Sequence, residues 1–263
     1  MARKCAQDLL DDLFITEPED IDLVAIAQSQ GATVEERPLT GTEARIVGSG
    51  DSAIITVNSN SRLERRRFSI GHELGHWMHD RGTVNMSCTK DKHEQFYTGQ
   101  GPEPLANAFA AELLLPAGML LPRLTGKAPV LETIQELAGT FQSSMTSTAC
   151  RVVEMRTHPL MVVCSTKTTR RWYKAATELA ELAKPLKYLG KDTLASKLFN
   201  EAGYQGQVEE VDADAWIDHP DAADYELVES SFRVTDDLVV SVLWWKDESQ
   251  LRDLQGASEE DDD

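Results

Sequence analysis

Apolar residues recur at helical spacing in two segments near the start of the chain, residues 3–14 (RKCAQDLLDDLF) and residues 20–30 (DIDLVAIAQSQ). The second segment has Pro18 just before its start and Gly31 just after its end, as helix termini prefer. Three runs rich in β-branched residues follow, ATVEERPL, ARIVG and AIITVN, separated by Gly, Ser and Asp. The pattern predicts two helices and then a small antiparallel sheet.

Helical spacing returns over residues 61–80, directly after the last predicted strand. Residues 81–102 show no sustained period and are predicted to form a long loop, a feature that is often functional in compact domains. A further helix is predicted from Glu103 to a stop at Pro116, and Pro104 suits its first turn. The apolar density of this helix predicts that it is buried.

The second half of the chain mixes both kinds of pattern. Residues 130–156 predict two short helices with a turn near Gln142 and Ser143. The run PLMVVCS predicts a strand, residues 168–203 predict a helix, and YELVESSFRV with DLVVSVLWW predicts a hairpin. These elements indicate a second, mixed α/β module.

The charge of the chain limits the kinds of partner. Its 263 residues include 26 Lys and Arg against 44 Asp and Glu, a formal net charge of −18. Such a charge repels phosphate backbones, so direct DNA binding is not expected and a basic protein partner is favoured. Part of the charge lies in residues 251–263, which are predicted to be an acidic, disordered tail.

Segments that would direct the chain to a membrane or out of the cell are not apparent. No run reaches eighteen apolar residues, and the N-terminus lacks the features of a signal peptide, so a cytoplasmic location is predicted. The four cysteines, Cys5, Cys88, Cys150 and Cys164, lie far apart and form no CxxC pair. This spacing favours neither a disulfide framework nor a thiolate zinc site.

The stretch FSIGHELGHWMH, residues 68–79, carries the strongest chemical signal. His72 and His76 lie four residues apart on one helix face, so both can bind one cation at the ~2.0–2.1 Å typical of zinc and nitrogen. Glu73, offset by about 100°, can act as general base on a zinc-bound water. Gly75 costs a helix roughly 1 kcal/mol relative to Ala and suggests close packing. The alternative is an ordinary helix that happens to be rich in histidine.

A catalytic zinc needs three protein ligands and one open position. The extended pattern HExxHxxGxxH is excluded because position 79 is His and position 82 is Gly. The remaining candidates for the third ligand are Asp91, His93, Glu94, Glu103 and Glu112. Glu103 is favoured because it opens a predicted helix that also carries Asn107, and a helix positions a ligand better than a loop does.

Three further residues have both a functional and an ordinary interpretation. Asn107 can orient a metal ligand by a hydrogen bond, or be a surface or locally bonded Asn. His79 can contact metal or substrate, or pack or face solvent. Tyr97, in the predicted loop, can stabilise the oxyanion of a tetrahedral intermediate, although Tyr is common in loops.

The stretch RRFSIGHELGHWMH together with EPLANAFAAELLLP resembles the ImmA/IrrE family of zinc metallopeptidases, bacterial enzymes similar to gluzincins in their site. The resemblance covers about residues 20–125. It implies that His72, His76 and Glu103 bind Zn²⁺ and that Glu73 is the catalytic base. It also implies an endopeptidase whose substrate is a repressor with a helix-turn-helix domain, so that cleavage switches on mobile-element or DNA-damage genes.

One departure from the family pattern affects the third ligand. Glu103 is flanked by Pro102 and Pro104 and so lies at a helix boundary, whereas the family's Glu is usually inside the helix. Glu112, nine residues further along the same helix and on roughly the same face, is therefore a reserve third ligand.

The segment ELAGTFQSSMTSTACRVVEM resembles a helix-turn-helix in which Gln142 replaces the usual glycine. Its predicted packing positions are Ala138, Phe141, Ala149 and Val152. Family members resembling this chain carry such a segment after the peptidase domain, and the negative charge favours packing or substrate docking over DNA binding. In some members a sensor-like domain follows; here Trp244 and Trp245 are interpreted as a core-plus-edge pair.

The sequence therefore predicts an α+β protein. Residues 1–125 form a zincin-like peptidase domain with a small antiparallel sheet and the HExxH helix, and residues 126–157 a helix-turn-helix-like segment. Residues 158–250 form a mixed α/β C-terminal module, and residues 251–263 the tail. The predicted function is zinc-dependent cleavage of a partner protein. The alternative is a non-catalytic, zinc-containing regulator that binds a partner or DNA.

Overall fold

The structure is a computed structural model of the whole chain. It describes residues 5–79, 83–89, 101–201, 204, 208–251 and 253, with the backbone alone for residues 83–89, Glu178 and Glu181. The chain divides into two compact units, Met1–Arg123 with Leu137–Ser147, and Leu124–Glu136 with Thr148–Asp263. The predicted linear boundaries at residues 125 and 157 stay predictions.

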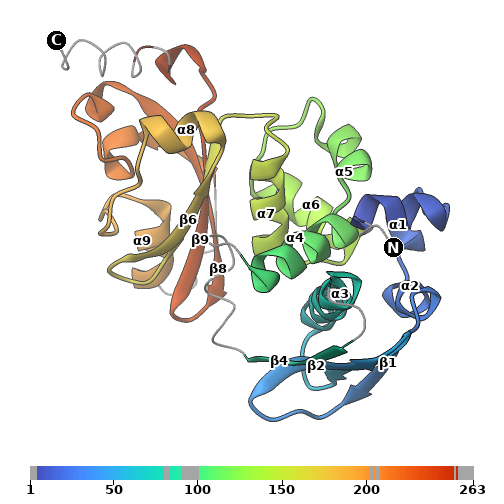
Figure 1. Cartoon of the computed structure of the whole chain (residues 1–263). Helices are drawn as coiled ribbons and strands as arrows, with labels where there is room; N and C mark the ends of the chain where they lie inside the picture. The colour runs from blue at the N-terminus through green and yellow to red at the C-terminus, as the bar shows by residue number, and fades with distance from the viewer. Residues whose placement is uncertain are drawn as a thin grey trace. The chain divides into compact units, whose positions relative to one another are not determined.

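The first part of the chain mixes helices and strands, as predicted (Figure 1). Its elements are α1 (Ala6–Asp12), the 3-10 helix η1 (Pro18–Asp20), α2 (Leu23–Ser29), β1 (Ala32–Arg37), β2 (Thr42–Ser49), β3 (Ser52–Asn58), α3 (Leu63–His79), β4 (Thr83–Thr89), α4 (Pro102–Leu114) and α5 (Ala117–Leu124). Helix α2 begins at Leu23, three residues after the predicted start at residue 20, because the Asp22 carboxylate accepts from the amides of Val24 and Ala25 and so caps the helix there.

The four-stranded sheet has the order β1-β3-β2-β4. Strands β2 and β3 pair as an antiparallel hairpin across Gly50 and Asp51, and β3 rather than β2 lies beside β1. As a result β1 and β3 are parallel, and the prediction of a purely antiparallel sheet is wrong. Strand β4 pairs with β2, so the predicted loop is wrong over residues 83–89.

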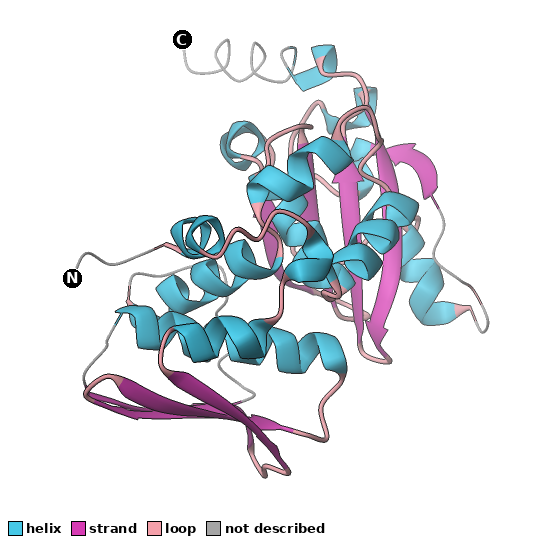
Figure 2. Cartoon of the chain, turned by 90° about the vertical axis from the view of Figure 1, so that its right-hand side faces the viewer, coloured by secondary structure: helices cyan, strands magenta, loops and turns pink. Residues whose placement is uncertain are grey.

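Helix α3 lies between this sheet and helix α4 (Figures 1 and 2). Its end is fixed by Trp77, which is fully buried and donates from its indole Nε1 to the Gln30 carbonyl at 2.8 Å. A Cβ at Gly48 would lie 2.5 Å from the Trp77 ring, so the strand must be bare at that point. One side of α3 therefore packs on the sheet in a fixed position, and the opposite side of α3 faces α4.

Helices α6 (Leu131–Phe141) and α7 (Met145–Glu154) confirm the two short helices predicted over residues 130–156. Gln142, which stands where glycine is usual, adopts a left-handed φ of +50°. All four predicted packing positions, Ala138, Phe141, Ala149 and Val152, are buried. Each of the two helices passes from one unit to the other.

The C-terminal unit is built on a five-stranded antiparallel sheet with the order β6-β5-β9-β8-β7. Its elements are β5 (Leu160–Ser165), β6 (Arg170–Ala175), α8 (Thr177–Leu182), α9 (Leu194–Asn200), β7 (Val208–Asp212), η3 (Ala213–Ala215), η4 (Ala222–Asp224), β8 (Glu226–Thr235) and β9 (Leu238–Trp244). The predicted hairpin is present as β8 and β9. Trp245 is buried and Trp244 half-buried, in keeping with the core-plus-edge interpretation.

The predicted helix over residues 168–203 is wrong. Its first part is strand β6, which pairs with β5 and is rich in the aromatic residues that favour strands. Pro185 and Gly190 then separate the two short helices α8 and α9, because proline cannot continue a helix and glycine weakens one. Neighbouring strand pairing and helix-breaking residues therefore outweigh the helical spacing of this segment.

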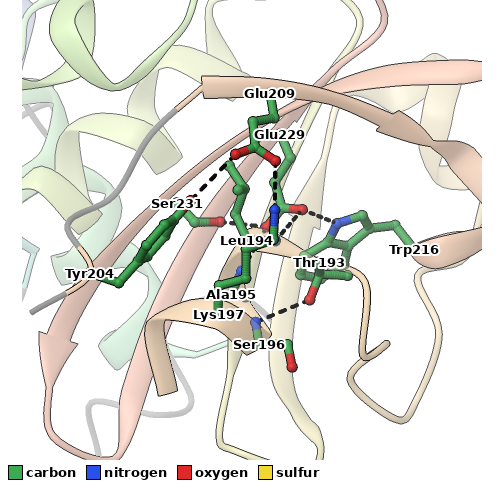
Figure 3. Close-up of polar contacts among 10 residues, drawn as sticks. All are labelled: Thr193, Leu194, Ala195, Ser196, Lys197, Tyr204, Glu209, Trp216, Glu229 and Ser231. Atoms are coloured by element: carbon green, nitrogen blue, oxygen red, sulfur yellow. Dashed lines mark hydrogen bonds and ion pairs between the residues drawn. The ribbon is translucent and has the colours of Figure 1, made fainter. Parts of the chain in front are cut away.

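A buried carboxylate joins α9 to the sheet (Figure 3). Glu229 on β8 is 0% exposed and accepts four hydrogen bonds: from the amides of Leu194 and Ala195, Trp216 Nε1 and the Ser231 hydroxyl, at 2.7–3.0 Å. Burial raises the pKa of Glu229, and these four donors oppose that rise. The carboxylate thus satisfies amides at the start of α9 that no helical partner reaches.

Two further sequence expectations concern the whole chain. Among the described residues no single helix is long and apolar enough to cross a membrane. Helices α4 and α5 have sufficient length and apolar composition only when taken together, and they are bent by 57° relative to each other. Among the cysteines whose side chains the structure describes, Cys5, Cys150 and Cys164 form no disulfide, and the side chain of Cys88 lies outside the described part.

Candidate metal centre

The two histidines of the HExxH stretch lie on the buried part of α3. His72 is 3% exposed and His76 is 0% exposed, and their rings meet edge to face with centroids 4.7 Å apart. This places His76 Nε2 and His72 Nε2 3.1 Å from each other. The helical spacing of four residues has therefore brought two nitrogen atoms to one point, as predicted.

Four small residues let α4 approach α3 closely. A Cβ at Gly75 would lie 2.9 Å from Ala106 Cα and 3.1 Å from the Ala106 carbonyl oxygen. A Cβ at Gly71 would lie 3.3 Å from the Cβ of Ala110. Gly75 alone was predicted to pack closely, yet a helix crossing is visible in the sequence as two pairs of small residues, each four residues apart.

This crossing brings the first turn of α4 to the histidines. Glu103 Oε2 lies 3.4 Å from His72 Nε2, and Glu103 Oε1 lies 3.8 Å from His76 Nε2. The side chain of Glu103 is 31% exposed, so the site has one open side. Among the described residues, His72, His76 and Glu103 form a group whose ligand atoms all lie within 4.8 Å of one another.

The geometry of these three residues fits a zinc ion. Tetrahedral bonds of ~2.0–2.1 Å separate neighbouring ligand atoms by about 3.3–3.5 Å. His72 Nε2 and His76 Nε2 lie 3.1 Å apart, and the nearest Glu103 oxygen lies 3.4 Å from the first (Oε2) and 3.8 Å from the second (Oε1), close to that separation. Two imidazoles with one carboxylate form a ligand set that catalytic zinc uses.

Asn107 lies one turn beyond Glu103 on α4 and makes the hydrogen bond predicted for it. Its Oδ1 lies 2.8 Å from His72 Nδ1. Because an amide oxygen can only accept, we assign the proton to Nδ1, which leaves the Nε2 lone pair directed at the other two ligands. Asn107 therefore fixes both the orientation and the tautomer of His72.

Glu73 follows His72 on the same helix and is 0% exposed. A carboxylate that is fully buried costs several kcal/mol unless its surroundings compensate its charge. A cation held by the neighbouring His72 and His76 would provide such compensation, since an opposite charge favours the ionised form. The burial of Glu73 beside the histidines is thus consistent with a site built around a cation.

The other candidates are accounted for as follows. Glu112 Oε1 accepts from the amide of Ala117 at 3.2 Å, next to the start of α5, and the residue is not part of the three-ligand group. The His79 ring packs edge to face on Phe109 with centroids 6.2 Å apart, and it too is outside the group. Asp91, His93, Glu94 and Tyr97 lie outside the described residues.

Comparison with known proteins identifies the region that holds this site. Residues 27–153 match the family model of the IrrE N-terminal-like domain, peptidase family M78. This region belongs to the ImmA/IrrE family. The ImmA/IrrE region includes α3 and α4 and hence all three candidate ligands, as well as α6 and most of α7.

Two curated relatives of the ImmA/IrrE region are metalloproteases. The chain is 33% identical over 113 residues to the radiation response metalloprotease IrrE of Deinococcus deserti, covering 43% of this chain and 40% of that protein. It is 30% identical over 113 residues to the protein of the same name from Deinococcus radiodurans, covering 43% of this chain and 34% of the relative. The chain thus matches well under half the length of each.

A solved structure resembles more of the chain. A transcriptional regulator of Mycobacterium tuberculosis has a TM-score of 0.60 and 14% sequence identity, over 94% of this chain and 76% of that one. At this identity the likeness concerns the fold alone. It extends beyond the ImmA/IrrE region into the C-terminal unit, whose fold therefore also occurs in another protein.

Proposed function

We propose that the chain is a zinc-dependent endopeptidase that hydrolyses a peptide bond in a partner protein. The observation that carries the proposal is the convergence of His72, His76 and Glu103, with Glu73 buried beside them. Membership of a family of metalloproteases supports the same activity. Because the chain matches less than half of each curated relative, its activity and substrate are proposed rather than transferred.

Each residue has a distinct task in this proposal. His72, His76 and Glu103 hold the zinc ion, and Asn107 keeps Nε2 of His72 directed at it. A bound zinc ion supplies a Lewis acid and lowers the pKa of water to about 7. Glu73 accepts a proton from the attacking water while the water oxygen bonds to the carbonyl carbon of the peptide. Glu73 then delivers that proton to the leaving amine as the C–N bond breaks.

The substrate we propose is a repressor with a helix-turn-helix domain, which the family resemblance implies. The printed name of the two curated relatives, radiation response metalloprotease, is compatible with a protease that acts in a stress response. A net charge of −18 favours a basic substrate, and DNA-binding proteins present basic surfaces. Cleavage would then inactivate the repressor.

The test uses purified full-length chain loaded with zinc and a helix-turn-helix regulator encoded next to it. Wild type is expected to produce one defined cut on gel and mass spectrometry, and a chelator should stop it. Glu73→Gln removes the base but keeps the size of the side chain, so cleavage should fall by at least about 100-fold. The matched control is Glu64→Gln, the same substitution in the first turn of α3.

Two results would count against this function. A Glu73→Gln variant that cuts as fast as wild type would exclude Glu73 as the base. Failure of the wild type to bind zinc, together with binding of the regulator without a cut, would favour the alternative of a non-catalytic regulator. Thermal unfolding of each variant should accompany the assay, because loss of the fold would also abolish cleavage.

A further inference from the structure

Positive charge is concentrated in one segment of an otherwise acidic chain. Residues 167–191 contain seven Lys and Arg against two Glu, a net charge of +5. The rest of the chain contains 19 basic and 42 acidic residues, a net charge of −23. The whole-chain charge of −18 therefore hides a segment of opposite sign. The prediction that the chain does not bind nucleic acid depended on the whole-chain charge, so it does not apply to this segment.

The fold gathers this segment at one corner of the C-terminal sheet. Strand β6 is an edge strand of that sheet (Figure 1). Residues 187–189 run back antiparallel to its start: Arg170 N donates to the Lys187 carbonyl at 2.9 Å, and Leu189 N donates to the Thr168 carbonyl at 3.1 Å. Arg170 and Lys187, 17 residues apart in sequence, thus lie opposite each other.

Two aromatic rings lie against these cations. The Arg170 guanidinium sits 4.8 Å from the ring centroid of Tyr173, and Lys187 Nζ lies 5.5 Å from that of Tyr188. Arg170 also donates to the Pro185 carbonyl, which ties the returning segment to β6. Tyr188 is 66% exposed, an unusual exposure for so large a ring, and it offers a flat face to solvent.

We call Lys167, Arg171, Lys187, Tyr188 and Lys191 the basic-aromatic patch. All five residues are exposed. Among the side chains that the structure describes, Lys167, Lys187 and Lys191 make no ion pair, whereas Lys174 on β6 is paired with Glu154. The patch therefore keeps positive charge that a partner can neutralise.

The acidic remainder of the chain does not prevent binding at this patch. At about 0.15 M salt the Debye length is ~8 Å, so exposed charges beyond that distance are largely screened. Acidic residues elsewhere slow the approach of an anion, but contacts made at the patch depend on the charges that lie there. The charge of the patch itself therefore determines which ligands can bind there.

We propose that the basic-aromatic patch binds single-stranded nucleic acid. Lysine and arginine neutralise successive phosphates, and an exposed ring provides a platform on which an unpaired base can stack. A duplex offers phosphates but hides its base faces, and an acidic peptide offers charge without a base. The exposed Tyr188 between two lysines is the feature that favours unpaired bases over both. This inference does not depend on the proposed protease activity.

The test is fluorescence anisotropy with the full-length chain and a labelled oligo(dT) of about 20 nucleotides at low salt. Wild type is expected to bind, with an affinity that falls steeply as salt rises. Reversal of both lysines, Lys187→Glu with Lys191→Glu, should raise the Kd by at least about tenfold. Tyr188→Ala should raise it at least about fivefold, whereas Tyr188→Phe, which keeps the stacking face, should leave it unchanged.

The matched control is Lys246→Glu. Lys246 is an exposed lysine of the same unit, and it follows the end of β9 that pairs with the start of β5, whereas the patch adjoins the other end of β5. Its reversal should change the Kd less than twofold. Circular dichroism and the unfolding midpoint should confirm that all variants are folded, as expected for exposed positions.

Four results would overturn the proposal. Wild type could fail to bind oligo(dT), or Lys246→Glu could weaken binding as much as the double reversal. A duplex of the same length could bind as tightly as the single strand, which would leave no role for unpaired bases. A poly-glutamate peptide of equal charge could compete as well as unlabelled oligo(dT), which would point to an acidic protein partner instead.

Discussion

The carboxylates at the centre of the two polar clusters, Glu229 and Glu103, have opposite kinds of partner. In the C-terminal unit, Glu229 is surrounded by four hydrogen-bond donors from α9, Trp216 and Ser231. In the N-terminal unit, Glu103 approaches two imidazole nitrogens, at least one of which presents a lone pair. The first carboxylate is stabilised by the protein itself, whereas the second belongs to a set of ligand atoms that a cation would complete.

Buried polar groups that stabilise a fold differ from those of a candidate binding site in how their hydrogen-bond donors and acceptors are matched. Polar groups that donate and accept in matched numbers fix a fold and need nothing else. The ligand atoms of His72, His76 and Glu103 lie within 4.8 Å of one another, as they must if they are to bind one cation together. The number of buried charges alone would not distinguish the two clusters, because each contains fully buried groups.

The largest expected effect is loss of metal. His76→Ala should abolish stoichiometric zinc after loading and dialysis, as measured by elemental analysis, because it removes one of three ligands. His79→Ala, which changes the neighbouring histidine that packs on Phe109, should retain one zinc per chain. Equal loss in both variants would break the comparison, since it would show that the three-ligand group is not the site.

Zinc should also stabilise wild type but not His76→Ala. Free zinc at 100 times its Kd adds about 2.7 kcal/mol to the free energy of unfolding when it binds the native state alone. The measurement is the unfolding midpoint with added zinc and with chelator. A midpoint of wild type that does not respond to zinc would contradict the assignment of the site.

Glu229→Gln should destabilise the C-terminal unit by about 3 kcal/mol. The new amide group would point a donor at amides and an indole N–H that also donate, so at least one buried donor would lose its acceptor. The measurement is urea unfolding, with zinc content unchanged. Glu226→Gln, an exposed position on the same strand, is the matched control and should change stability by less than about 0.5 kcal/mol.

Gly75→Ala should destabilise the N-terminal unit by about 1–3 kcal/mol and should also weaken zinc binding. The added methyl would meet backbone atoms of Ala106 at 2.9 and 3.1 Å, so α4 must move and carry Glu103 with it. Gly71→Ala meets the Ala110 side chain at 3.3 Å and should cost less. An equal cost for the two variants would argue against the close crossing as the cause.

Asn107→Ala should lower zinc affinity by about tenfold, because His72 would lose the partner that fixes its tautomer. Competition with a chromophoric chelator measures this change. The free energy of unfolding of the metal-free chain should change little, which separates a role in orienting the ligand from a role in packing. A larger change in folding than in zinc affinity would reverse that conclusion.

The smallest effect concerns pH. Burial raises the pKa of Glu229, so the folded state binds its proton more tightly than the unfolded state, where the ordinary value is 4.5. The stability of wild type relative to Glu229→Gln should therefore rise as the pH falls from neutral toward 4.5, and level off below it. Denaturant titrations of both proteins across this range provide the measurement. A difference that shrinks as the pH falls would contradict the raised pKa.

Much of the candidate metal site could be predicted from the sequence because its signals are local. His72 and His76 share a helix whose period fixes their relation, and Glu103 with Asn107 shares another. The crossing of the two helices depends on long-range contact, yet its small residues are visible in the sequence at positions 71, 75, 106 and 110. Of these four residues, only Gly75 entered the prediction of close packing.

The errors arise where distant pairing decides the structure. Strand β6 forms because β5 lies beside it, and nothing within residues 170–175 identifies that neighbour. The parallel pairing of β1 with β3 likewise depends on which strand of a hairpin reaches β1. Glu229 was not singled out either, although a lone charge within the otherwise uncharged run VESSF of a buried strand is a signal that could have been used.

The crossing of α3 and α4 also fixes the spacing in sequence between its small residues and the candidate metal ligands. Gly71 immediately precedes the first histidine ligand, and Ala106 lies three residues after Glu103. In a related sequence without a structure, a pair of small residues four apart that follows an HExxH helix would mark where the second helix crosses. Counting back three residues from the first of that pair would then identify the third ligand, even where a long and variable insertion separates the two helices.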